Sequence, residues 1–313
     1  KTCDIMIPTQ KKRNHKHAYL AVFDNQKWVP ICYGTQKGKV CYFNEIGKDI
    51  AYLPLYYDNQ GIHPITDPFI LDSRGRIKYL HADTSKRKKV ILSRKYYLAK
   101  HIFDYAKTLT GGHFEASNNP DFSDPDTIHT ISHWLLSADS FEIKPQKTYR
   151  YWRYVSAKNK GCNLAELAFY SDKEEKELTG TIIGTNASVR YDTMPMDKSK
   201  VFDKDILTYY EAPSTVDYPW VGLDFNKPVS INKIIYTPRN DDNNIHAGDL
   251  YELFYWEYNH WMSLGQQRAI ESKLTYTNVP DNALLLLKDL TKGEEERIFT
   301  YENDKQVLSL IHI

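Results

Sequence analysis

The sequence has few cysteines, which excludes a domain held together by cross-links. Its 313 residues include only Cys3, Cys32, Cys41 and Cys162, too few for a disulfide framework and without the spacing of zinc ligands. We expect buried free thiols, although the positions of Cys32 and Cys41 would allow a disulfide across neighbouring strands in an oxidising compartment. The cysteines therefore do not indicate whether the protein works in a reducing or an oxidising compartment.

The sequence also has no excess of positive or negative charge. The 41 Lys and Arg residues nearly cancel the 40 Asp and Glu residues, so the charge balance gives no reason to expect bulk binding of nucleic acid. No apolar run approaches the length of a membrane span, and no signal-peptide pattern is present. The sequence therefore predicts neither a nucleic-acid partner nor a membrane-spanning segment, and it does not indicate an oligomeric state.

Aromatic residues, by contrast, are abundant. The chain has 24 tyrosines and many short runs of alternating polarity, separated by turn signals such as DNQG and DSRG. Such runs are typical of antiparallel strands. One stretch beginning at Lys95 has apolar residues at helical spacing and predicts a short helix. The length of the chain indicates two or three units rather than a single core.

An acidic turn lies in residues 201–212, which read VFDKDILTYYEA. It places Asp203, Asp205 and Thr208 close together, ahead of a strand-like run over residues 220–239 that alternates with period two. Several oxygen ligands in one loop suit a hard cation such as calcium. The alternative is a solvated turn in which the Asp side chains bond their own backbone.

Two motifs in this half of the chain resemble the discoidin domain, also called the coagulation factor V/VIII type C domain. They are the VFDxDxxTYY turn with its W-V-x-L-D-F strand, and YRYWRYVSAKNKGCNLAELAFY over residues 149–170, which is similar to a strand pair that usually closes that domain. Here the pair comes first, so the sequence resembles a circular permutation of the fold. The resemblance implies a galactose-binding-like β-sandwich in which Glu166 joins Asp203, Asp205 and Thr208 around a structural calcium ion.

The same resemblance implies a glycan or glycoprotein ligand, bound by loops at one end of the sandwich. An aromatic ring would stack on the sugar while polar side chains bond its hydroxyls. The candidate ligand-binding residues are Arg239, Asn240, Asn243, His246 and Tyr210, with Trp256 or Trp261 as the stacking platform. Alternatively, the tryptophans belong to the core and Arg239 is a structural partner of Asp224.

Near the start of the chain, HAYLAVFD followed by KWVPICYG resembles the end of a bacterial transglutaminase-like domain. In that family a cysteine attacks an amide carbonyl while a histidine moves the proton, and His17 stands at the histidine position. The cysteine would lie upstream of Lys1, and Cys32 replaces the family's Asp. The alternative is that His17 is an ordinary loop histidine. In either case we expect no catalysis by this chain.

These patterns predict a mainly β fold in four segments. Residues 1–38 would be a remnant of the transglutaminase-like domain, 39–145 a second β-sandwich with a connecting segment, and 146–307 the discoidin-like sandwich. Residues 308–313, which read LSLIHI, resemble a translated sequencing adapter and are expected to be a non-native tail. We therefore expect the chain to be a piece of a longer protein.

Three functions follow as hypotheses. The first is a non-catalytic carbohydrate-binding module of a secreted, periplasmic or surface-anchored bacterial protein, a location that the resemblance implies. The second is a part of a transglutaminase-like cysteine peptidase or amidase whose nucleophile lies upstream. The third is a pair of spacer domains.

Overall fold

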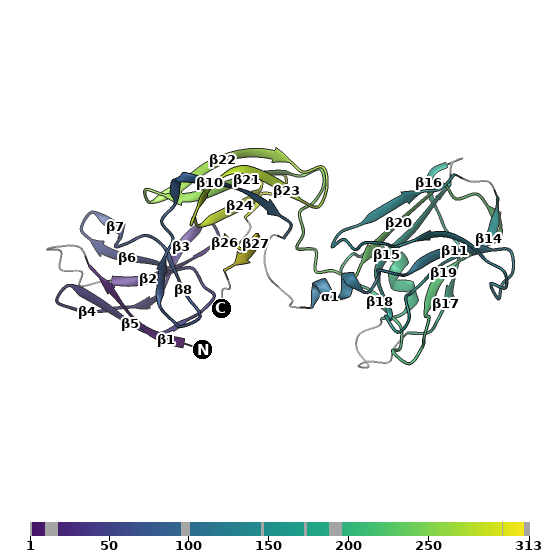
Figure 1. Ribbon diagram of the computed structural model, residues 1–313, viewed down its shortest axis with the longest axis horizontal. Helices are drawn as coiled ribbons and strands as arrows, with labels where there is room; N and C mark the ends of the chain where they lie inside the picture. The colour runs from purple at the N-terminus through teal and green to yellow at the C-terminus, as the bar shows by residue number, and fades with distance from the viewer. Residues whose placement is uncertain are drawn as a thin grey trace. The chain divides into compact units, whose positions relative to one another are not determined.

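The computed structural model describes residues 2–9, 18–94, 101–144, 147–171, 174–187, 196–295 and 297–309 (Figure 1). The protein is mainly β, with 56% of its residues in strands, several antiparallel sheets and essentially no helix. Among the described residues, no helix is long and apolar enough to cross a membrane. The chain forms two compact units, which we call the split unit (residues 1–97 and 243–313) and the inserted unit (residues 98–242).

These units differ from the segments expected from the sequence. Strand β2 (Ala18–Asp24) pairs with β6 (Leu53–Asp58), which crosses the expected boundary at residue 38. Strand β10 (Asp83–Leu92) pairs with β23 (Leu274–Asp281), which joins the expected middle domain to the expected discoidin segment. The reason is that strand pairing acts between residues far apart in the sequence, whereas polarity patterns report only local structure.

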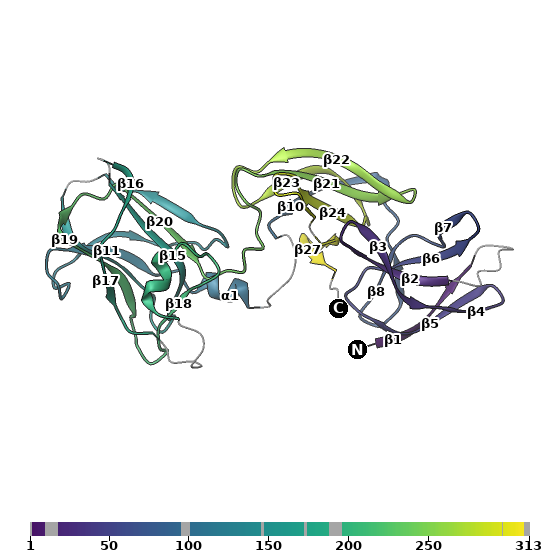
Figure 2. The same ribbon diagram turned by 180° about the vertical axis from the view of Figure 1, so that it is seen from behind.

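The inserted unit is a β-sandwich whose ten strands, as far as the structure describes this unit, form two antiparallel sheets (Figure 2). The first sheet has the order β12 (Asp126–Thr130), β11 (His113–Ser117), β14 (Tyr149–Val155), β19 (Trp220–Val229) and β17 (Thr181–Gly184). The second has β13 (Asp139–Glu142), β20 (Lys233–Pro238), β15 (Cys162–Ser171) and β16 (Glu174–Leu178), with β18 (Tyr210–Glu211) beside β15. The helix α1 (Ile102–Lys107) precedes the sandwich, and the 3-10 helix η1 (Lys198–Phe202) precedes β18.

One apolar core joins the two sheets of the inserted unit. Trp152 of β14 and Phe169 of β15 meet inside it, with ring centroids 6.4 Å apart. These two strands were expected to form a pair, but they lie in opposite sheets. Strand β14 pairs with β11 and β19, while β15 pairs with β20. The motif therefore marks the two faces of one sandwich core rather than a hairpin.

The split unit is built from short antiparallel sheets (Figure 1). One sheet contains β1 (Thr2–Pro8), β5 (Val40–Gly47) and β4 (Thr35–Lys37), and a second contains β3 (Lys27–Tyr33), β2, β6 and β7 (Gly61–Pro64). The largest contains β22 (His260–Arg268), β21 (Leu250–Glu257), β24 (Leu285–Asp289), β26 (Phe299–Glu302), β27 (Lys305–Leu308) and β25 (Glu294–Glu295). The pairs β10 with β23 and β8 (Phe69–Leu71) with β9 (Ile77–Tyr79) complete the unit.

Strands buried on both faces stack these sheets in layers. In β2, Leu20 and Val22 enter the core shared with β1 and β5, while Tyr19 and Phe23 enter a second core. That second core also contains Leu286 of β24 and Leu284, which directly precedes this strand. Leu285 and Leu287 of β24 point the other way, into a third core with β10 and β23. The apolar run 283–287 is therefore buried on both faces.

The structure also shows the state of the four cysteines and the position of residues 308 and 309. All four cysteines are free, and burial raises the pKa of the Cys41 thiol. Leu308 ends strand β27, and the Ser309 hydroxyl accepts a hydrogen bond of 2.9 Å from the Ala51 amide. These two residues belong to the fold, contrary to the expectation of a tail at 308–313. Residues 310–313 lie outside the described part of the chain.

Candidate functional site

The acidic turn follows η1 in the inserted unit and is closed by its own hydrogen bonds. The Asp203 carboxylate accepts from the Asp205 amide at 3.0 Å and from the Thr208 hydroxyl at 2.9 Å. The Asp205 carboxylate accepts from the Leu207 amide at 3.0 Å. This is the alternative considered for the turn, in which Asp side chains bond their own backbone.

Glu166 approaches this turn from strand β15. Its side chain is half-buried and forms a hydrogen bond with Asp203, while its Oε1 atom is buried with no partner among the residues that the structure describes. Burial, and then the negative charge of Asp203, raise the pKa of Glu166 to about 7. Burial of Asp203 acts in the same direction, but hydrogen bonds from Asp205, Thr208 and Lys200 outweigh it and lower its pKa. Glu166 therefore keeps its proton up to near neutral pH, while Asp203 stays ionised.

Nearby lysines offset part of this negative charge. Lys200 Nζ lies 3.4 Å from Asp203 Oδ2, and Lys204 forms an ion pair with Glu177. Over the described ranges, no three His, Cys, Asp or Glu side chains gather where they would hold a metal ion. Calcium also accepts hydroxyl and carbonyl oxygens, and the Thr208 hydroxyl lies 3.1 Å from the Asp205 carbonyl oxygen. The turn thus offers calcium two carboxyl groups, Glu166 and Asp203, with neutral oxygens beside them.

Arg239, the first predicted ligand residue, contacts two aromatic rings and two polar side chains in the inserted unit. Its guanidinium group lies 3.7 Å from the ring centroid of Tyr105 and 3.6 Å from that of Tyr209. Its NH1 atom is 3.5 Å from Glu211 Oε2 and 3.4 Å from Asn163 Oδ1. Arg239 is therefore a structural residue. Its partner is not Asp224, which forms a two-bond ion pair with Arg150 at 2.7 and 2.9 Å.

Two more predicted ligand residues of the inserted unit also have structural roles. Tyr210 is fully buried, and its hydroxyl donates to the Thr185 carbonyl oxygen at 2.6 Å. Asn240 shapes a turn, because its side chain donates to the Pro238 carbonyl and accepts from the Asp242 amide, each at 2.8 Å. Neither side chain is open to a ligand.

The remaining predicted ligand residues belong to the split unit. Asn243 is 2% exposed, and the His246 amide donates to the Tyr251 hydroxyl at 2.9 Å. Trp256 and Trp261 pack edge to face with centroids 5.1 Å apart and form part of an apolar core. The alternative that the tryptophans are core residues is therefore the observed one. Neither unit brings all seven predicted residues together.

A pocket of about 500 Å³ lies between loops of the inserted unit, beside the Arg239 cluster. It is lined mainly by polar groups: Thr108, Asn159, Lys160, Asn163, Glu211, Ser214 and Thr215, with Gly161, Ala212 and Pro213. Asn163 and Glu211 also contact Arg239, so this largely covered arginine fixes one wall of the pocket. No sequence motif predicted the pocket, although most of its lining comes from the turn-forming stretches KNKG and PST.

Comparisons with protein-family models, curated proteins and solved structures found no match to this chain. The discoidin-like and transglutaminase-like resemblances therefore stay hypotheses drawn from short motifs. His17, the predicted catalytic histidine, lies outside the described residues.

Proposed function

We propose that the chain is a non-catalytic carbohydrate-binding module of a larger secreted or surface-exposed bacterial protein. The inserted unit would be its galactose-binding-like, discoidin-type sandwich. The observation that carries the proposal is the polar pocket between the loops of this sandwich. The glycan would bind there rather than at the seven residues predicted from the sequence.

The pocket has the chemistry that a sugar needs. Each sugar hydroxyl both donates and accepts a hydrogen bond, so it binds best where donors and acceptors alternate. Lys160 donates, Glu211 accepts, and Asn159, Ser214 and Thr215 can do both. The contacts of Glu211 and Asn163 with Arg239 hold two of these groups in place before a ligand arrives, which lowers the entropy lost on binding.

A calcium ion in the acidic turn is a second part of this proposal. Glu166, Asp203 and Thr208 would hold it, and it would replace the proton on Glu166. The ion would have a structural role, because it would tie strand β15 to the turn that leads into β18. Loop positions near the pocket would then depend on the ion.

A glycan array probed with the whole chain tests the proposed sugar site. We expect Lys160→Ala, and separately the double variant Ser214→Ala with Thr215→Val, to weaken binding at least about tenfold, the effect of one lost hydrogen bond to a charged or well-placed group. Lys158→Ala is the matched control, because Lys158 lies in the same loop, pairs with Asp217 at 3.6 Å and does not line the pocket. Equal losses in Lys158→Ala and Lys160→Ala, or no glycan bound by the wild-type chain, would contradict the proposal.

A further inference from the structure

A second polar pocket, of about 310 Å³, lies wholly within the split unit. Strand β9 and the middle of β10 form one side, the end of β23 with its following turn forms another, and β26 with its following turn forms the third. No residue predicted from the sequence lines it. Its polar lining comes from Lys78, Lys88, Asp281, Asn282, Thr300 and Glu302.

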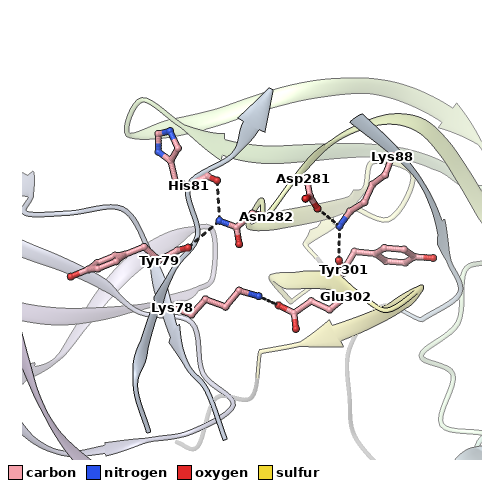
Figure 3. Close-up of polar contacts among 8 residues, drawn as sticks. All are labelled: Lys78, Tyr79, His81, Lys88, Asp281, Asn282, Tyr301 and Glu302. Atoms are coloured by element: carbon pink, nitrogen blue, oxygen red, sulfur yellow. Dashed lines mark hydrogen bonds and ion pairs between the residues drawn. The ribbon is translucent and has the colours of Figure 1, made fainter. Parts of the chain in front are cut away.

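Two ion pairs face each other in this pocket (Figure 3). Lys78 pairs with Glu302, and Lys88 Nζ lies 2.8 Å from Asp281 Oδ1 and 2.8 Å from the Tyr301 carbonyl oxygen (Figure 3). Each ammonium group has three N–H donors and each carboxylate has about four acceptor positions. In each pair, the lysine therefore keeps at least one N–H donor and the carboxylate keeps acceptor positions that a ligand could use.

Hydrogen bonds and tight turns hold the backbone around these ion pairs in place. Asn282 donates to the carbonyl oxygens of Tyr79 and His81, both at 3.1 Å, and so joins the turn after β23 to the end of β9 (Figure 3). Asn282 and Asn303 both have positive φ angles, 53° and 50°, as tight turns require. A wall built in this way changes little when a ligand binds.

The lining contains one buried polar group that the protein does not satisfy. Thr300 is 4% exposed, and its hydroxyl has no hydrogen-bond partner within the described ranges. Leaving a buried hydroxyl unbonded costs about 1–3 kcal/mol, so such groups are uncommon. Leu80, Pro280 and Ala283 supply an apolar part of the wall beside these polar groups.

We propose that this pocket is a second binding site of the chain, for a neutral saccharide or similar polyol. Two lysines and two carboxylates leave no net charge there, so an anionic ligand gains little from the site. A pair of adjacent hydroxyls, by contrast, accepts from a lysine and donates to the neighbouring carboxylate at the same time. The buried side chains of Leu80 and Pro280 form the apolar floor beneath the ring, and the unbonded hydroxyl of Thr300 lies behind this wall. This site is independent of the one proposed in the inserted unit.

Amide chemical shifts of the ¹⁵N-labelled whole chain, titrated with maltose, lactose, cellobiose and glucuronate, test the assignment. We expect at least one neutral disaccharide to shift the amides of Asn282 and Asn303. Lys78→Met and Glu302→Gln should each weaken that binding about tenfold, the effect of one charged hydrogen bond. Lys86→Met is the matched control, because Lys86 is 74% exposed on β10 and does not line the pocket. The Lys160→Ala variant should leave these shifts unchanged, which separates this site from the pocket of the inserted unit.

Three results would overturn the assignment. No shift of these amides with any neutral sugar in the wild-type chain would exclude the site, whatever the variants do. Glucuronate binding tighter than the neutral sugars would show an anion site instead. An equal loss in Lys78→Met and Lys86→Met, with an unchanged thermal midpoint, would place the ligand elsewhere on the split unit.

Discussion

The two units differ in how their strands find partners. The inserted unit comes from one continuous stretch of chain, and its two sheets enclose one core. The split unit needs residues from both ends of the chain, because β2 packs against Leu284 and Leu286 at β24, and β10 pairs with β23. Among the described strands, most pairings of the split unit nevertheless join strands that follow one another in the chain, such as β2 with β3 and β21 with β22. Most pairings of the inserted unit join strands that are not consecutive, so local sequence motifs report its strand pairing less well.

The comparison also separates two kinds of polar pocket. The pocket of the inserted unit is formed by loops, and Arg239, which is 17% exposed, contacts two residues of one wall. The pocket of the split unit is formed largely by strand residues and carries its own ion pairs. Rigid strands hold side chains more accurately than loops, so we expect the split-unit pocket to be the more selective of the two.

We expect the largest effect from a truncation, because it removes one of the two chain segments that the split unit needs and leaves the inserted unit whole. Removing residues 243–313 takes Leu284 and Leu286 away from Tyr19 and Phe23 and leaves β10 without β23. We expect the remaining chain to lose the unfolding transition of the split unit and to keep that of the inserted unit. Thermal unfolding followed by circular dichroism, with residues 98–242 alone as the reference, checks this. Two transitions in the truncated chain would show that residues 1–97 fold independently.

A glycine substitution tests how closely the strands approach in each unit. A Cβ atom at Gly222 of β19 would lie 2.0 Å from the Trp152 carbonyl oxygen of the neighbouring strand. We expect Gly222→Ala to lower the free energy of unfolding of the inserted unit by about 2–3 kcal/mol through overpacking. At Gly47 of β5, in the split unit, the nearest atoms would be 3.4 Å away. Gly47→Ala should change stability by less than about 0.5 kcal/mol, and equal effects in a denaturant titration would contradict the prediction.

Some features could be predicted from the sequence because they depend on neighbouring residues. The alternation in YELFYWE places Tyr251 and Leu253 in one core and Trp256 in another, as period two requires. The mainly β class and the free thiols followed from composition in the same way. The position of Glu166 beside Asp203 came from a family resemblance rather than from a local pattern.

The ligand residues could not be predicted in this way. Arg239 and Tyr210 have the residue types of a sugar site, but the fold surrounds them with partners. The pockets themselves form where segments far apart in the sequence meet, such as the loop at Lys160, and the turn at Asn282 with the strands around it, and those meeting points depend on tertiary structure. Residue type gives the chemistry that a side chain has available, and only the fold shows whether that chemistry is already used.

Arg239 and Arg76 allow the stability contributions of a largely covered arginine and an exposed arginine to be compared. We expect Arg239→Met to lower the free energy of unfolding by about 2 kcal/mol, because it removes two aromatic contacts and a half-buried ion pair with Glu211. Arg76→Met is the control in the split unit, where the arginine is 69% exposed and pairs with Asp72 at 2.8 Å. Such a surface pair contributes less than about 1 kcal/mol. If Arg239→Met kept full stability and lost only sugar binding, the ligand role predicted from the sequence would be restored.

The smallest expected effect comes from the proton that Glu166 holds beside Asp203. Because the pKa of Glu166 is raised to about 7, the folded protein holds this proton where the unfolded chain has already lost it. The stability that the protonated group provides is complete below the unfolded pKa of about 4.3 and is lost as the pH rises towards 7 and above. Since the side chain is only half-buried, we expect the loss to be about 1–2 kcal/mol.

Replacing Glu166 with glutamine should remove this dependence on pH. The variant should match the wild-type chain at pH 4 and exceed its free energy of unfolding by about 1 kcal/mol at pH 8, as measured by urea titration. Calcium gives the opposite order at pH 8, because an ion between the ionised carboxylates would raise the stability of the wild-type chain more than that of Glu166→Gln. A wild-type chain that responds to neither pH nor calcium would mean that Lys200 and Lys204 already neutralise the turn. The inserted unit would then hold its sandwich together, as the split unit does, without help from a bound proton or cation.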